Sequence, residues 1–446
     1  MTMFTMPRAP ASLTARASGA SAIPPMPACC MGTEQPTRRV NAVSSMGPPA
    51  TPSAHHLEPL RRLRAMALDK RAVDDLLTRV HREVDSGLLP SCQVALGYQG
   101  ELAVFETYGD ATPETRYVVF SCTKAIMAAA AWQLIGEGLL DPAVTVVEVI
   151  PEFMAESRPG GREAVTVESL MTHTAGFPHA PMGPPEWWTR EGRLERFSQW
   201  RFNWDPGTRF EYHPTTAHWV LAEVLERVAG MDYRDLVRRR IALPLDLPRL
   251  RVGLPPGAEG AAEGATVAEL VARGEPCSRD ELMAAFGVPE LPVTEVTEEA
   301  LLRFNDPRYR ELGVPGGGGI MTAADLALFY QALLHNPGGL WDPDVLADGT
   351  GRVRTTYPDP FLGMPALRTL GVVVAGDDGK SSFRGFGKTV SPRAFGHGGA
   401  GGQIGWADPA TGLSLAYCTN GIDANQIRQP RRGVAISSLA GVCAPR

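Results

Sequence analysis

Several features that would indicate other classes of protein are scarce or missing in this sequence. Seven cysteines are present, but they form no C-x-x-C pair, and no H-E-x-x-H occurs. Disulfide frameworks and zinc sites need regular cysteine or histidine spacing, so we expect no metal and no cofactor, and a reducing compartment. No apolar run approaches the roughly 20 residues that span a bilayer, which predicts no membrane partner.

The charge balance also does not indicate a protein that binds polyanions. The net charge is −6, which gives no general attraction to nucleic acid, so we expect no nucleic-acid partner. Apolar residues make up 44% of the 446 residues, enough for a globular core. Lysine is rare and occurs at only four positions, Lys70, Lys124, Lys380 and Lys388.

Residues 1–65 differ from the rest of the chain. They are rich in Ala, Pro, Ser, Met and Arg, and the first acidic residue is Glu34. We expect a disordered N-terminal extension there. A secretory signal needs an apolar core of about 7–15 residues, and Pro24, Pro25 and Pro27 interrupt its one candidate, so we expect a cytoplasmic protein. A transit peptide is the alternative, because the segment contains arginine and little acid.

Strand patterns stand near both ends of the remaining chain, and helical patterns lie between them. Residues 71–84 repeat apolar residues at helical spacing, and the strands 92–98 and 101–108 flank Gln99-Gly100, a tight turn. A largely helical section follows from 121 to about 335. Further strands are expected at 369–376, 394–408 and 413–420, the last two joined by a turn at 408–412, before a helical tail at 424–439.

This order predicts an α+β fold, with one antiparallel sheet built from both chain ends, flanked by helices, and a mainly helical region inserted. We expect a single domain over 66–446. Its sheet subdomain would take about 66–120 and 360–446, and its helical subdomain about 121–359.

The segment 120–140, FSCTKAIMAAAAWQLIGEGLL, contains the most informative lysine. Ser121 predicts a helix N-cap, and the apolar residues that follow predict a buried helix. Burial removes hydration from an ammonium group and lowers its pKa, so that it can act as a base. Ser121 and Lys124 are three residues apart and lie on one helix face, which suggests a nucleophile with its activating base. The alternative is a capping serine followed by a lysine that reaches solvent.

Five stretches in order resemble the serine β-lactamase and penicillin-binding-protein superfamily, most closely its family VIII carboxylesterases. The first is Ser121-Cys122-Thr123-Lys124, which matches the nucleophile motif. The others are 170–177 (LMTHTAGF), 204–230 (WDPGTRFEYHPTTAHWVLAEVLERVAG), 314–334 (VPGGGGIMTAADLALFYQALL) and 395–420 (FGHGGAGGQIGWADPATGLSLAYCTN). The resemblance covers nearly everything from about residue 70 and implies the β-lactamase type of α/β sandwich.

The resemblance implies roles for several residues. Tyr212 takes the place of the family tyrosine, and a phenolate there would be stabilised by the Lys124 cation and could pass a proton to a leaving alcohol. His397, Gly398 and Gly399 occupy the place of the family's third motif, K-T-G, where the glycines let the substrate approach the backbone. The backbone N–H groups of Ser121 and Ala400 would form the oxyanion hole.

Two departures from the family pattern concern specificity. His397 stands where β-lactamases often have lysine, so the sequence predicts no fixed cation for a substrate carboxylate. Tyr212-His213-Pro214 replaces Tyr-x-Asn, and proline has no side-chain amide to hold a β-lactam side chain. Both departures favour neutral esters, and β-lactam hydrolysis stays open as a side activity. His173 is expected to be a structural loop histidine.

The implied function is that of a carboxylesterase acting on small esters, of short acyl chain, through an acyl-enzyme on Ser121 with Lys124 and Tyr212 as general base and acid. The alternatives are a β-lactamase or D-alanyl-D-alanine carboxypeptidase, and an inactive scaffold relative. Which group is the acylation base stays open. A nucleotide-binding loop at 371–382 is excluded because Val374 stands where a Walker loop needs glycine. Trp187, Trp188, Trp200 and Trp204 would either line a substrate pocket or form core.

Overall fold

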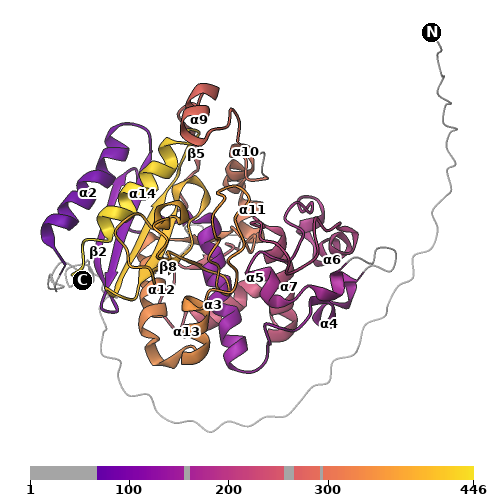
Figure 1. The fold of residues 1–446 in the computed structure, drawn as a ribbon. Coiled ribbons are helices and arrows are strands. Elements are labelled where there is room, and N and C mark those ends of the chain that lie inside the picture. The colour runs from indigo at the N-terminus through magenta and orange to yellow at the C-terminus, as the bar shows by residue number, and fades with distance from the viewer. Residues whose placement is uncertain (1–67, 155–160, 256–265, 292–294, 446) are drawn as a thin grey trace, which may run out of the picture. The chain divides into compact units, whose positions relative to one another are not determined.

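A six-stranded antiparallel sheet lies between helices in the computed structural model (Figure 1). The structure describes residues 68–154, 161–255, 266–291 and 295–445. In order across the sheet the strands are β2 (Glu101–Gly109), β1 (Ser91–Tyr98), β10 (Leu413–Thr419), β9 (Ile404–Asp408), β8 (Phe395–Gly396) and β7 (Val373–Val374). Because two strands precede the helical region and four follow it, the predicted α+β fold with a sheet from both chain ends is confirmed.

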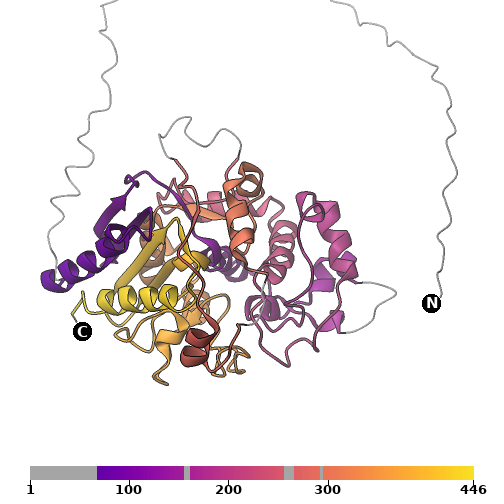
Figure 2. The ribbon, with the colours of Figure 1, turned by 90° about the horizontal axis from the view of Figure 1, so that it is seen from above.

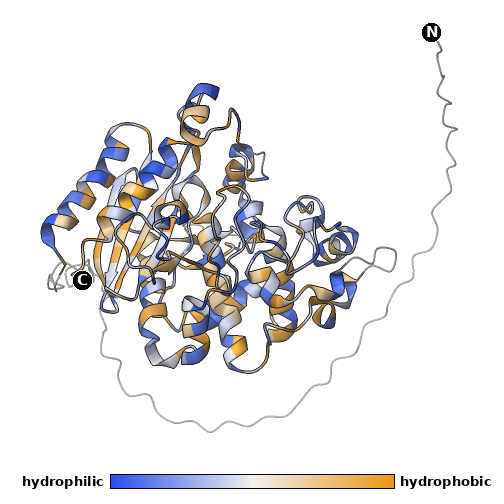
Figure 3. Cartoon of the chain, in the orientation of Figure 1, coloured by the Kyte–Doolittle hydropathy of each residue, from blue (hydrophilic) through white to orange (hydrophobic). Residues whose placement is uncertain are grey.

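Helices cover both faces of this sheet. On one face α2 (Lys70–Asp85) and α14 (Arg428–Ala440) pack against each other (Figure 2), and α12 (Ala323–His335) contacts β1, β9 and β10 on the other face. The periodicity that predicted α2 places Leu76 and Val80 in the core, both fully buried. Figure 3 shows the consequence, since α2 carries many hydrophilic residues while much of the sheet is hydrophobic.

The inserted region is mainly helical, as expected, but it also contains short strands. Its helices are α3 (Thr123–Gly136), α4 (Val146–Val149), α5 (Val167–Met171), α6 (Arg190–Gln199), α7 (Thr216–Ala229), α8 (Tyr233–Val237), α9 (Arg279–Phe286), α10 (Glu298–Leu302), α11 (Pro307–Leu312) and α13 (Pro343–Gly351). Two small sheets accompany them, β3 (Tyr117–Val118) with β6 (Gly319–Met321) and β4 (Arg251–Val252), and β11 (Gly421–Asp423) with β5 (Val271–Arg273).

The strand predicted at 394–408 is interrupted. It forms β8 and β9, separated by the turn Ala400–Gly402. Gly401 and Gly402 have φ values of 70° and 95°, which glycine adopts without strain and which end the extended conformation. The break takes His397, Gly398 and Gly399 out of the regular sheet.

Two further boundaries differ from the prediction. The strand expected at 369–376 is reduced to β7 at the edge of the sheet, where Val373 and Val374 pair with β8. The predicted tail helix begins at Arg428, because the Asn425 side chain accepts the N–H groups of Ile427 and Arg428. Pro430 is tolerated because it lies in the first helical turn, where backbone N–H groups have no partner within the helix.

The predicted extension over residues 1–65 lies outside the described residues. Arg62–Arg446 form one compact unit, and the proposed subdomain boundaries near 120 and 360 stay predictions. Across the described ranges, no helix has both the length and the apolar character needed to cross a membrane.

The helix α3 runs through the interior. Every residue from Thr123 to Leu134 is buried. Trp132 donates its indole N–H to the Leu370 carbonyl at 2.9 Å. Gly371 lies so close that a Cβ there would come within 2.3 Å of the Ala128 Cβ. The close approach at Ala128 therefore fixes the position of the helix that carries Ser121 and Lys124 at its start.

Substituting Gly371 tests this packing. Gly371 and Gly379 both have positive φ, but a Cβ at Gly379 meets nothing within 4 Å. We expect Gly379→Ala to cost about 1 kcal/mol of unfolding free energy through backbone strain alone. Gly371→Ala should cost about 1–3 kcal/mol more, because it also overpacks the contact with Ala128. Urea denaturation measures both, and equal midpoints for the two variants would contradict this description of α3.

Candidate active site

Ser121 precedes α3 in a single 3₁₀ turn, Phe120–Cys122. The predicted capping role of Ser121 is wrong, since Cys122 occupies the N-cap position and no side chain caps α3 there. The Ser121 hydroxyl is engaged elsewhere. It accepts hydrogen bonds from Lys124 and Tyr212 instead of from the helix backbone.

The turn that presents Ser121 is stabilised by hydrogen bonds of the Thr123 side chain. Phe120 has a φ of 44°, a conformation that is unfavourable for a bulky residue and persists only where surrounding contacts impose it. The buried Thr123 hydroxyl supplies such contacts, because it donates to the Phe120 carbonyl at 2.5 Å and accepts the Gly319 N–H at 2.8 Å. The beginning of α3 is thus anchored to β6.

Lys124 is fully buried, and its Nζ has three hydrogen-bond partners. Its Nζ lies 3.2 Å from Ser121 Oγ, and it donates to the carbonyls of Pro214 and Gly316, each at 2.7 Å. Burial is the largest effect on this amine and lowers its pKa, while the nearby Tyr212 opposes that change. A Cβ at position 316 would lie 3.1 Å from Nζ, so the glycine there keeps room for the amine.

These contacts orient the amine. An ammonium group has three N–H donors, and here they face two carbonyls and the Ser121 hydroxyl. A neutral Lys124 amine has two N–H groups and one lone pair. Because a carbonyl can only accept, both N–H groups donate to the carbonyls of Pro214 and Gly316. The lone pair then faces Ser121 Oγ, which is the arrangement that a general base needs.

Tyr212 contacts the same hydroxyl from another side. Its OH donates to Ser121 Oγ at 2.9 Å, and Lys124 Nζ lies 5.1 Å from its ring centroid. Histidine rings form hydrogen bonds with the backbone of Glu211 and His213, the two residues that flank Tyr212. His173 Nδ1 accepts the His213 backbone N–H at 3.1 Å, and His213 Nδ1 lies 2.7 Å from the Glu211 carbonyl. His173 therefore has the structural place expected of it.

Four buried histidines surround the site in neutral form: His173, His213, His218 and His397. Burial is the main cause that lowers the pKa of each, for His213 to about 3. Positive charge on Lys124 and Arg368 lowers the pKa of His397 further. The site thus contains imidazole rings that orient other groups without adding charge at neutral pH.

The predicted substrate-binding strand lies beside the nucleophile. The Cys122 thiol donates to the His397 carbonyl at 3.1 Å, and a Cβ at Gly399 would lie 2.3 Å from the Val119 carbonyl. Only glycine fits at position 399. In the described part of the chain, the backbone N–H groups of Ser121 and Ala400 donate no hydrogen bond, which leaves them available to an incoming oxyanion.

Sequence reasoning missed Arg368. The prediction that no fixed cation faces the site is wrong, because Arg368 Nη1 lies 3.1 Å from His397 Nε2 and its Cζ lies 5.3 Å from the Tyr212 ring centroid. The histidine that replaces lysine in the third motif is therefore accompanied by an arginine from another segment. An arginine two residues before the apolar stretch 370–375 is the one signal that could have indicated it.

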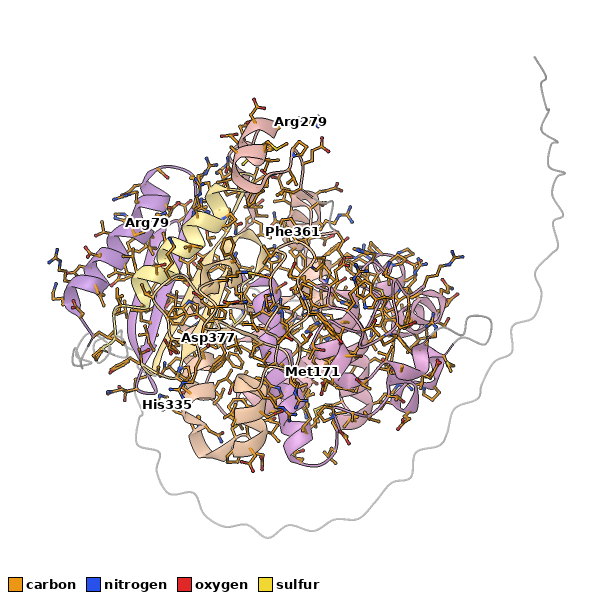
Figure 4. All side chains as sticks on the ribbon, viewed as in Figure 1. Arg79, Met171, Arg279, His335, Phe361 and Asp377 are labelled. Carbon is orange, nitrogen blue, oxygen red and sulfur yellow. The ribbon has the colours of Figure 1, made fainter. Side chains whose placement is uncertain are left out.

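Ser121, Tyr212, Arg368 and residues 397–400 line one pocket, with a volume of about 1510 Å³. Its apolar wall includes Phe210, Leu282, Leu301, Phe361, Leu362, Met364 and Ile422. Phe361, labelled in Figure 4, is 54% exposed at this wall. The four tryptophans considered above do not line this pocket. Trp187 and Trp200 are buried in the main core, and Trp188 packs against it.

The described residues contain no group of three or more histidine, cysteine or acidic side chains placed to hold a metal ion. The chemistry that the site offers is that of a hydroxyl with two adjacent proton-transfer groups and two free backbone donors.

Comparisons with known proteins show which family the chain resembles. The protein-family model described as Beta-lactamase matches residues 74–439. Esterase/beta-lactamase LipL of Mycobacterium tuberculosis is 28% identical over 322 residues, which is 68% of this chain and 68% of LipL. Esterase EstB of Burkholderia gladioli is 28% identical over 257 residues, 54% of this chain and 62% of EstB. The chain thus aligns with slightly less than two thirds of EstB.

A solved structure of a family VIII carboxylesterase has a similar fold. The TM-score is 0.65 at 25% sequence identity, and the match covers 83% of this chain and 98% of that one.

The buried histidines predict acid sensitivity. Because their pKa values are lowered in the folded state, unfolding takes up protons as the pH falls below the ordinary histidine pKa of about 6.5. Their contribution to stability is complete above that pH and is lost as the pH falls toward the folded pKa, about 3 for His213. Each histidine contributes at most about 1.4 kcal/mol per pH unit within its window.

Thermal unfolding midpoints measured between about pH 7.5 and pH 5.5 check this expectation. We expect a clear decrease toward acid, with a smaller slope in His213→Gln. The control His335→Gln, at an exposed histidine labelled in Figure 4, should retain the parent slope. A midpoint that does not change over this range would show that the histidines are not buried in neutral form.

Proposed function

Because the chain belongs to the Beta-lactamase family, whose model matches residues 74–439, we propose that it is a carboxylesterase that hydrolyses esters of short acyl chain through an acyl-enzyme on Ser121. One observation carries this proposal. Ser121 Oγ lies 3.2 Å from Lys124 Nζ and 2.9 Å from the Tyr212 hydroxyl, within reach for proton transfer. The esterase names of LipL and EstB and the fold of the family VIII carboxylesterase support it.

The first half-reaction forms the acyl-enzyme. Ser121 Oγ attacks the ester carbonyl carbon while its proton passes to the pair Lys124 and Tyr212. The carbonyl electron pair moves to oxygen, and the Ser121 and Ala400 N–H groups stabilise the resulting oxyanion. When the carbonyl re-forms, the C–O bond to the alcohol breaks, and the alcohol oxygen takes up the proton by way of Tyr212.

The second half-reaction releases the acid. Water occupies the place of the alcohol and gives a proton to the same pair, and its oxygen attacks the acyl carbonyl. The ester bond to Ser121 then breaks, and Oγ regains its proton. We assign the proton transfers to the pair as a unit, because both groups contact the same hydroxyl.

The lining of the pocket supports this substrate class. His397, Gly398 and Gly399 form the edge along which we place the ester, with Gly398 open enough that a Cβ would meet its first neighbour, the Gln403 carbonyl, at 3.6 Å. The apolar wall opposite suits the acyl chain or the alcohol. The proposed reaction needs no metal and no cofactor.

β-Lactam hydrolysis is the second candidate function. LipL is named as both an esterase and a β-lactamase, and the Arg368 cation removes one of the two arguments against a substrate carboxylate. The other argument remains. Pro214 binds Lys124 through its carbonyl and has no side-chain amide that could hold a β-lactam side chain. An inactive scaffold would have no need to keep a buried amine aimed at a serine.

Paired kinetics separate these functions. We expect kcat/KM for p-nitrophenyl butyrate to exceed that for a chromogenic cephalosporin by a wide margin. Removing the nucleophile in Ser121→Ala should lower both activities by roughly 10⁴-fold or more. The control Ser86→Ala, at an exposed residue outside the pocket, should keep the parent activity. A higher kcat/KM for the cephalosporin would show that the esterase assignment is wrong.

A further inference from the structure

Arg368 places a guanidinium group at one wall of the active-site pocket. Its Cζ lies 5.7 Å from the Phe210 ring centroid and 5.3 Å from that of Tyr212. The side chain is partly exposed, and the pocket is the surface that it lines. The preceding residue, Leu367, has a φ of 47°, a strained conformation that surrounding contacts must maintain. The arginine is thus held in place by its backbone and by two rings.

This guanidinium has almost none of its hydrogen-bonding capacity used. Its one hydrogen bond within the described residues runs from Nη1 to His397 Nε2 at 3.1 Å, and Nε is buried with no partner. His397 can accept this bond because Nδ1 lies 2.7 Å from the Gly398 carbonyl and carries the ring proton. A guanidinium has five N–H donors, so most of those of Arg368 form no hydrogen bond with the described residues.

No carboxylate among the described residues lies close enough to form an ion pair with this charge, although Asp359, which lines the same pocket, acts on it at longer range. None of the acidic residues that the structure describes forms an ion pair with Arg368, whereas the pocket's other arginine, Arg384, is paired with Asp378. Burial lowers the pKa of Arg368, while the nearby Tyr212 and Asp359 oppose that change, and arginine remains charged at neutral pH. A half-buried charge without an ion-pair partner is less well solvated than in bulk water, and a bound anion relieves this cost.

The location indicates which anion fits. Arg368 contacts Tyr212, which reaches the nucleophile, and His397, which begins the edge where the proposed function places the ester. A planar guanidinium matches the two oxygens of a carboxylate, with two parallel N–H···O bonds. An ester whose acyl chain ends in a carboxylate could therefore place its carbonyl at Ser121 and its anionic end at Arg368.

We propose that Arg368 is a specificity-determining residue that binds a carboxylate carried by the substrate, so that the preferred esters are half-esters of short dicarboxylic acids. This inference rests on the proposed esterase function and names its substrate class. It replaces the neutral esters that the sequence alone suggests.

Two esters of equal length test the inference. Mono-p-nitrophenyl glutarate and p-nitrophenyl pentanoate differ only in the end of the acyl chain, which is a carboxylate in one and a methyl group in the other. We expect the parent enzyme to favour the glutarate in kcat/KM by about tenfold or more, because charge-assisted hydrogen bonds to carboxylates are of this strength. A parent enzyme that favours the pentanoate overturns the inference whether or not any variant folds.

Variants of Arg368 locate the preference. In Arg368→Met the ratio of the two kcat/KM values should fall by roughly 10- to 100-fold, mainly through a higher KM for the glutarate. Arg368→Lys keeps the charge without the planar fork and should lie between. The control Arg393→Met removes an exposed cation that does not line the pocket, and its ratio should equal that of the parent.

Two outcomes contradict the inference in different ways. If both esters lose activity in parallel in Arg368→Met, with a shifted pH profile for the pentanoate, Arg368 acts by positioning Tyr212 or tuning Lys124 and not by binding substrate. If Ser121→Ala hydrolyses both esters as fast as the parent, the proposed esterase function has failed, and this result is independent of the ratio.

Discussion

The burial of the Lys124 amine is the constraint on which the rest of the site depends. A buried ammonium group is unfavourable unless polar atoms surround it or it loses its proton. Here two backbone carbonyls, of Pro214 and Gly316, take two of its donors and direct the third position to Ser121 Oγ. The close packing of α3 keeps these distances fixed. The Ser121 hydroxyl therefore has the Lys124 amine beside it in the position of a general base.

The same constraint explains the charge pattern of the pocket. Lys124 and Arg368 are the cations nearest to Tyr212, and the four histidines around them stay neutral because they are buried. His213 and His397 each use both ring nitrogens in hydrogen bonds, and His173 accepts one through Nδ1. A site that must hold an oxyanion, and in our proposal also a carboxylate, thereby has positive charge and backbone donors beside the nucleophile.

The sequence predicted the sheet, the serine-lysine pair and Tyr212, because each depends on local pattern or on the resemblance of a contiguous stretch. It did not predict what long-range packing decides. The carbonyls of Pro214 and Gly316 contribute backbone atoms, which side-chain patterns do not reveal. Arg368 reaches His397 from a segment 29 residues away, so its absence from the third motif suggested a missing cation. Ser121 was expected to cap α3, since its hydroxyl chemistry suits either role.

Labelling of the nucleophile tests the central claim most directly. A p-nitrophenyl phosphonate ester should modify Ser121, as peptide mapping by mass spectrometry would show, at a rate that rises with pH as Lys124 loses its proton. Lys124→Met should slow this labelling by roughly 100-fold or more, since the variant keeps the hydroxyl but has no amine beside it. Label on a different residue, or equal rates in parent and Lys124→Met, would contradict the account.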